Sequence, residues 1–244
     1  MKWPGCERIC GQSFYRRGGW LLLCLIFTPL LVGWEFLGFA SHSWHQKMTV
    51  EVEVGDQRYA GSSVVELSVF GHPEIPMVHG VRNLELEGEA VVVALPAHRY
   101  LFALLTYNAF LARDVFKDRI IEAVHAPGER WAGALSRLRE TRVIDPKQYP
   151  LLVTFTDLTD PTTVKAVDPE NLAATFGPGV SLKRLTLEIT DEPVTEGKIE
   201  QVLGWWCDLR KKRARLNGST SIAISDNELS NNLGTGSFRI GDCT

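Results

Sequence analysis

The chain has 244 residues, of which 45% are hydrophobic and 23% are charged, and its formal net charge at pH 7 is -3. This composition is ordinary for a globular protein, and the slight negative charge argues against a dedicated nucleic-acid binder, which usually carries a basic excess. We therefore expect no nucleic acid as a partner. The 5 cysteines are scattered along the chain, which excludes a disulfide-rich scaffold.

An apolar stretch with a single charged residue, Glu35, runs from Trp20 to Ala40. As a helix, residues 20–40 would be roughly 31 Å long, which matches the hydrocarbon thickness of a bilayer. Glu35 lies near the outer end, where its carboxylate reaches the lipid headgroups. Aromatic residues gather at the same end, as they do at a membrane–water interface: Trp34, Phe36, Phe39 and Trp44. The sequence therefore predicts a transmembrane helix over residues 20–40, with the lipid bilayer as its partner.

The residues that flank this stretch indicate its orientation. Basic residues are concentrated before it: Lys2, Arg8, Arg16 and Arg17. The positive-inside rule then keeps residues 1–19 in the cytoplasm and exports the remainder. We expect a single-pass protein of the inner membrane whose C-terminal domain is periplasmic. A cleaved signal peptide is the alternative, because Gly38 and Ala40 are small enough for a cleavage site, and it exports the domain equally.

The first part of the exported region has the pattern of antiparallel strands. Residues 48–54 alternate strictly between apolar and polar side chains, which predicts a half-buried strand. Gly55 and Asp56 predict a turn, and residues 62–70 its hairpin partner. Residues 84–95 predict a further strand or hairpin.

After Pro96 the spacing changes. Apolar residues recur every three or four positions up to Val124, which predicts one helix, or two that are broken near Asn108. Residues 129–140 predict a short helix of the same kind. Residues 149–156 then read as a continuous apolar strand.

Two more helices and a strand complete the domain. Asp168, followed by Pro169, has the chemistry of a helix start, and Gly177 that of a left-handed helix end. Residues 181–190 alternate as a strand, and residues 197–207 predict a final amphipathic helix. We therefore expect the α+β class: one mixed α/β domain with a largely antiparallel sheet over residues 47–209, after the N-terminal transmembrane helix.

Residues 210–244 are expected to form a largely disordered tail, because they are basic at the start and then rich in Ser, Asn and Gly. Their short apolar islands could pair as a hairpin at the edge of the sheet. The strongest charge cluster opens this tail: Arg210, Lys211, Lys212, Arg213 and Arg215. Two interpretations remain open, namely a solvated helix end favoured by the helix dipole, and a surface that attracts anionic lipid or an acidic envelope protein.

Common catalytic motifs are missing from the sequence. Four carboxylates near strand ends are candidates for a metal site, although the same residues could cap turns and helices: Asp157, Asp160, Asp168 and Asp191. Capping is the favoured interpretation, so we expect no cofactor.

Two aromatic residues are candidates for contact with a partner, and two cysteines are candidates for a disulfide. Trp205 and Trp206 are expected to be exposed and available for contact with a partner. Cys207 and Cys243 both fall in the exported region, where a disulfide can persist, although Cys207 beside two tryptophans could equally be a buried apolar residue.

Several segments resemble a recurring group of uncharacterised bacterial proteins with an N-terminal hydrophobic segment and an exported α/β domain: residues 61–67, 88–96, 149–157, 167–179 and 187–194. The resemblance covers most of residues 47–206 and implies no activity, ligand or catalytic residue. The sequence therefore predicts a membrane-anchored envelope protein, interpreted as a non-catalytic binding or accessory module. The alternative is a metal-dependent hydrolase of an envelope substrate, built on the four aspartates.

Overall fold

The computed structural model describes residues 41–70, 83–105, 110–125, 130–221, 228–241 and 243. The predicted cytoplasmic segment 1–19 and the predicted transmembrane helix 20–40 lie outside these residues. Within the described ranges, no helix has the length and apolar character needed to cross a bilayer.

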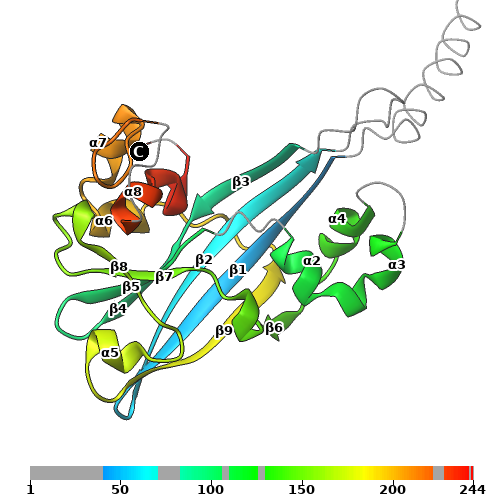
Figure 1. Ribbon diagram of the computed structural model, residues 1–244. Coiled ribbons are helices and arrows are strands. Elements are labelled where there is room, and N and C mark those ends of the chain that lie inside the picture. Colours follow the sequence, from blue (N-terminus) through cyan, green and yellow to red (C-terminus); the bar gives the residue numbers. More distant parts are fainter. Residues whose placement is uncertain are drawn as a thin grey trace, which may run out of the picture. The chain divides into compact units, whose positions relative to one another are not determined.

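The larger sheet has six strands in the order β10-β3-β2-β1-β9-β6, and all neighbouring pairs are antiparallel (Figure 1). Its strands are β1 (Ser41–Val54), β2 (Gln57–Phe70), β3 (Asn83–Glu89), β6 (Thr141–Val143), β9 (Val180–Thr190) and β10 (Arg239–Ile240). The predicted hairpin is confirmed: β1 and β2 pair along their whole length, from Ser41 opposite Phe70 to Val54 opposite Gln57. Gly55 closes the turn with a φ of +58°, a conformation that favours glycine.

The smaller sheet has four antiparallel strands in the order β4-β5-β7-β8. They are β4 (Val91–Leu95), β5 (Arg99–Ala103), β7 (Leu152–Phe155) and β8 (Val164–Ala166). The prediction of a helix directly after Pro96 is wrong for residues 99–103. Ala97 and His98 both have positive φ, 61° and 54°, and the chain turns back as β5. A strand that is buried on both faces is apolar along its whole length, so its pattern resembles that of a helix.

Within the described ranges, helices begin only after β5. The structure has α2 (Leu111–Val115), α3 (Ile121–Val124), α4 (Arg130–Leu135) and α5 (Leu172–Phe176), and short 3₁₀ helices at Lys117–Arg119, Pro146–Gln148, Pro161–Thr163 and Thr235–Ser237. The predicted end of α5 at Gly177 is confirmed, and its φ of 94° favours glycine, but its ψ of 170° lies outside the left-handed helical conformation that the sequence predicted. The predicted start is wrong: Asn171, not Asp168, caps the helix, because its side chain accepts from the Ala174 N–H at 3.2 Å.

The smaller sheet forms the middle of three layers. On one face, Val93, Leu101 and Leu152 pack into a core with Val50 and Leu187 of the larger sheet, which α2, α4 and α5 complete. The larger and smaller sheets approach so closely at Gly61 that a Cβ there would lie 2.1 Å from the Val92 carbonyl oxygen. The opposite face carries a second core, which the C-terminal part of the chain covers.

Trp44 belongs to the first core and not to an interfacial aromatic belt. It lies in β1, only 3% of its surface is exposed, and its ring meets that of Trp131 edge to face at 5.6 Å. The described domain therefore includes residues 41–46 of β1, which precede the predicted boundary at residue 47.

The C-terminal part is folded where the structure describes it, so the prediction of a largely disordered tail over residues 210–244 is wrong there. Its elements are α6 (Lys198–Val202), α7 (Trp206–Lys212), α8 (Leu229–Asn232) and β10, and α6 to α8 gather on the side away from α2, α3 and α4 (Figure 1). The single helix predicted over residues 197–207 is interrupted after Val202. Leu216 and Phe238 lie in the second core beside Phe102, Phe155 and Trp206, which explains why the described part of the tail packs on the domain.

Candidate functional site: a basic groove at the end of α7

An open groove of about 770 Å³ lies between the end of α7 and residues 234–236, at the start of the 3₁₀ helix Thr235–Ser237. Among the described residues that line it, four side chains are cationic, none is acidic, and the remainder are small or sulfur-containing: Arg210, Lys211, Arg213, Ala214, Arg215, Gly234, Thr235, Gly236 and Cys243. Four residues of the charge cluster that stood out in the sequence thus form one wall of a concave surface, whereas the fifth, Lys212, is exposed and does not line it.

A tight turn at the end of α7 shapes this wall. Arg213 takes up a left-handed conformation, with φ 52° and ψ 36°, and caps the helix through a hydrogen bond from its N–H to the Arg210 carbonyl. The Ala214 N–H then bonds to the Leu209 carbonyl at 3.0 Å, and Ala214 is buried. The turn therefore anchors its apolar residue in the protein and leaves the basic side chains beside it in the groove.

Arg215 is held in place by the chain segment on the opposite side. Its backbone forms an isolated bridge with Gly234, and its Nη1 donates to the Asn231 carbonyl at 2.8 Å. Asn231 is itself buried and accepts from the Asn217 side chain at 3.0 Å. One guanidinium of the groove is consequently positioned before any ligand arrives.

Arg210, Lys211 and Arg213 are not neutralised by a neighbouring carboxylate in the described part of the chain. Their charges lie at the C-terminal end of α7, where the helix dipole favours cations by roughly 0.3–1 kcal/mol each. This local benefit accounts for basic residues at a helix end. It does not account for the absence of acidic side chains among the described residues that line the groove.

Arg239 supports the C-terminal layer from within. Only 4% of its side chain is exposed, and its Nη1 lies 2.5 Å from Glu200 Oε1. The guanidinium also stacks 5.6 Å from the centre of the Trp206 ring. The Glu89 carboxylate accepts hydrogen bonds from the backbone N–H groups of Lys198 and Ile199, each at 3.1 Å, and so caps α6. This buried network ties α6, α7 and β10 to the edge of the larger sheet.

Burial raises the pKa of Glu89, although hydrogen bonds from Ile199 and Lys198 and the charge of Arg239 oppose the shift. A folded state that holds its proton more tightly than the unfolded chain loses stability as the pH rises between the two pKa values. We expect the contribution of Glu89 to fall from about pH 4.5 upward and to level off above its folded pKa. Urea unfolding of Glu89→Gln between about pH 4 and pH 7 should lack this downward component. The exposed Glu85→Gln on the same strand should retain it, and equal pH slopes in Glu89→Gln and the parent chain would contradict the assignment.

Trp205 and Trp206 do not form the exposed contact surface that the sequence suggested. Trp206 is 0% exposed, and its Nε1 donates to the Thr235 carbonyl at 3.0 Å. Trp205 is half-buried, packs against Phe155 with ring centres 5.6 Å apart, and donates to the Leu158 carbonyl. Both indoles fill the second core, because the face of the smaller sheet beneath them is apolar.

Asp157 and Asp160 are used as caps of local turns. The Asp157 carboxylate accepts from both the N–H and the hydroxyl of Thr159, at 2.8 and 2.7 Å, and these hydrogen bonds lower the pKa of Asp157. Asp160 makes the same pair of bonds with Thr162, at 2.9 and 2.7 Å.

Asp168 and Asp191 are also engaged elsewhere. Asp168 accepts from the Glu170 N–H at 2.8 Å, and Asp191 forms an exposed ion pair with Arg139. None of the four aspartates belongs to a group of three potential metal ligands among the described residues. Among the described residues, these four carboxylates therefore do not form a cluster of three metal ligands.

Cys207 and Cys243 are brought together by the fold and are free thiols in the structure. Their Sγ atoms and a carboxylate oxygen of Glu200 all lie within 4.8 Å of one another. Burial, reinforced by Cys243 and Glu200, raises the pKa of Cys207 to about 12. Both thiols are half-buried, and Cys243 lines the basic groove.

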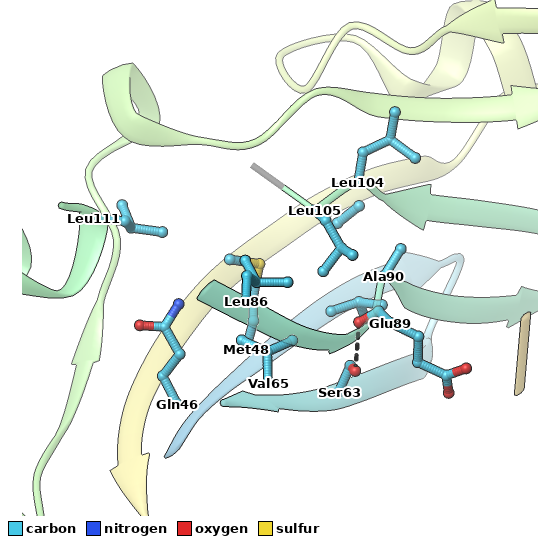
Figure 2. A pocket seen from close by; sticks show the side chains of 12 residues that line it. Gln46, Met48, Ser63, Val65, Leu86, Glu89, Ala90, Leu104, Leu105 and Leu111 are labelled. Carbon is cyan, nitrogen blue, oxygen red and sulfur yellow. Dashed lines mark hydrogen bonds between the residues drawn. The ribbon is translucent and has the colours of Figure 1, made fainter. Parts of the chain in front are cut away.

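Two further hollows differ in character from the basic groove. A cavity of about 30 Å³ lies between the strands β1 to β3 and the segment after β5, where mainly apolar side chains converge and Ser63 donates to the Glu89 carbonyl at 2.6 Å (Figure 2). It has room for about one water molecule and not for an organic ligand. An open groove of about 560 Å³ along β2 and β3 carries Glu66, Glu85 and Glu87, so its charge is opposite to that of the groove at α7.

Comparison of the chain with protein-family models, with curated proteins and with solved structures finds no match.

Proposed function

We propose that this protein is a membrane-anchored module of the bacterial envelope, without catalysis of its own, that binds a phosphate-bearing anion in the groove at the end of α7. The observation that carries the proposal is the lining of that groove, in which Arg210, Lys211, Arg213 and Arg215 lie together and the described lining residues include no acidic side chain. The hydrolase alternative gains no support, because its four aspartates do not meet.

The choice of a phosphate group follows from arginine chemistry. A guanidinium presents parallel N–H donors that match two phosphate oxygens, and such charge-assisted pairs are stronger than neutral hydrogen bonds. Arg215 is already held by Asn231, so less conformational entropy is lost when it binds. Because the groove is open to water, binding should weaken steeply as the salt concentration rises.

The membrane location is supported by the sequence alone, through the apolar residues 20–40 and the basic residues before them. A phosphate-bearing lipid headgroup and a soluble phosphoanion would both suit the groove. Protease added to intact spheroplasts should degrade the domain that contains β1. Protection until the spheroplasts are lysed would rule out the proposed topology.

Charge removal in the groove is expected to weaken binding strongly. With roughly 1 kcal/mol per basic residue, the triple variant Arg210→Gln, Lys211→Gln and Arg213→Gln should bind about 100-fold more weakly. The measurement is isothermal titration of the full-length, detergent-solubilised chain with inorganic pyrophosphate and with glycerophosphoglycerol, a soluble phospholipid headgroup. The control variant Lys183→Gln with Arg184→Gln removes two exposed cations of β9 and should bind as the parent does.

The ligands distinguish the source of the anion. Tighter binding of the headgroup points to lipid, and tighter binding of pyrophosphate points to a soluble phosphoanion. Equal affinity of the triple variant and the parent, or binding of polyglutamate with no binding of either phosphate compound, would refute the proposal.

A further inference from the structure

The two cysteines of the C-terminal layer are separated by a long loop of chain and return to the same place. Cys207 lies in the first turn of α7, whereas Cys243 follows β10 at the end of the chain. The Cys243 Sγ lies 3.8 Å from the Cys207 carbonyl oxygen, and the two sulfur atoms are within 4.8 Å of each other. We infer that Cys207 and Cys243 form a disulfide bond that ties the C-terminal end of the chain to α7.

The secondary structure around Cys243 gives it little support of its own. The strand β10 has two residues and is paired only at Arg239 opposite Glu89 and at Ile240 opposite Gly88. Below the sheet edge, Phe238 is fixed in the second core, which brings the end of the chain to α7. A covalent bond at Cys243 secures the last part of this segment, and it requires the sulfur atoms to close to about 2.05 Å by side-chain rotation.

The bond forms by a balanced thiol–disulfide exchange. Each thiol loses its proton, the two sulfur atoms join, and the two electrons pass to a disulfide oxidant, which is reduced to two thiols. Oxidants of this class operate in the compartment to which the domain would be exported, so this inference rests on the proposed function. Under that topology Cys6, Cys10 and Cys24 remain in the cytoplasmic or membrane segments, which leaves Cys207 and Cys243 as each other's partners.

A metal ion is the competing occupant of this cluster, because Glu200 supplies a third potential ligand. The Glu200 Oε1 atom, however, already lies 2.5 Å from the guanidinium of Arg239. A cation bound between Glu200 and the two sulfur atoms would lie beside this fixed positive charge. The arrangement therefore favours a sulfur–sulfur bond over a metal site.

The bond would also restrain one residue of the basic groove, because Cys243 forms part of its lining. The groove is already formed in the structure while both thiols are free, so the bond would hold Cys243 in place and is not needed to shape the groove.

Peptide mapping tests the pairing directly. The full-length chain is isolated from bacteria without reductant, its free thiols are blocked with N-ethylmaleimide in denaturant, and it is cleaved with trypsin. Cleavage after Lys198, Arg210 and Arg239 places each cysteine in a peptide of its own, residues 199–210 and 240–244. We expect one cross-linked species, lighter than the two thiol peptides together by two hydrogen atoms, that separates on reduction. Recovery of both peptides with maleimide attached would refute the bond in the cell.

A second experiment tests whether Cys207 and Cys243 can form a disulfide independently of whether the domain is exported. Purified, reduced chain is treated with oxidised glutathione and mapped in the same way. If the cross-link forms only in this experiment, the pairing stands and the proposed export fails; if it forms in neither, the pairing fails. Stoichiometric zinc in protein with reduced thiols would also overturn the inference. Cys243→Ser should abolish the cross-linked species, whereas Cys24→Ser should leave it intact.

Discussion

Replacing Arg239 by alanine is expected to lower the free energy of unfolding by about 3–5 kcal/mol, because it removes a buried guanidinium from its ion pair with the largely buried carboxylate of Glu200. The Arg239 side chain is 4% exposed and pairs with Glu200, and its charge also acts on Glu89, which caps α6. Once the guanidinium is removed, Glu200 must remain charged in a poorly solvated place or take up a proton. Urea denaturation of the full-length chain, followed by tryptophan fluorescence, measures the loss.

Arg184→Ala provides the matched control for this prediction. Arg184 forms an ion pair with Glu51 on the outer face of the larger sheet, where about half of its side chain is exposed, so its loss should cost less than about 1 kcal/mol. The double variant Arg239→Ala with Glu200→Gln should cost less than the sum of the two single changes, because the uncompensated charge is gone. A loss below about 1 kcal/mol for Arg239→Ala itself would show that the network is not buried in solution.

Phe238→Ala should also destabilise the chain, by about 3–5 kcal/mol, because it leaves a cavity in the second core. The side chain is 0% exposed, and its ring centre lies 5.9 Å from that of Phe102 and 5.8 Å from that of Phe155. The measurement is the midpoint and the slope of urea denaturation. The effect tests whether the Ser-, Asn- and Gly-rich tail is part of the folded domain.

Val143→Ala is the control for lost apolar volume. Val143 lies on the edge strand β6 and is 62% exposed, so its truncation should change the free energy of unfolding by no more than about 0.5 kcal/mol. An unchanged midpoint for Phe238→Ala would mean that the tail does not pack on the smaller sheet in solution.

Strands with one polar face were predictable from the sequence, because alternation is a local signal. Val50 and Val52 point into the first core while Glu51 and Glu53 stay at the surface, and the hairpin of β1 with β2 follows directly. The strand β5 was not predictable in this way. Leu101 and Phe102 are both fully buried, on opposite faces, and only the presence of layers on either side makes such a segment a strand.

The charge cluster after α7 was predictable as a candidate, but the groove was not. Its second wall, residues 234–236, lies far along the chain in a segment that composition alone marked as disordered. The supporting network is equally non-local: Glu89 caps α6 at Ile199, 110 residues further on. Trp205 and Trp206 were misjudged for the same reason, since the apolar surface that buries them comes from the smaller sheet.

The placement of the smaller sheet between two cores determines where this domain can be cut. A chain that stopped after α7 would lack Phe238 and would increase the solvent exposure of Phe102 and Phe155. The smaller sheet would then carry an exposed hydrophobic patch, which promotes aggregation. Such a shortened chain should aggregate, although it would keep every strand of the smaller sheet. The solubility of the domain therefore depends on the segment after α7 that carries Phe238, and any fragment made for crystallisation must retain this segment.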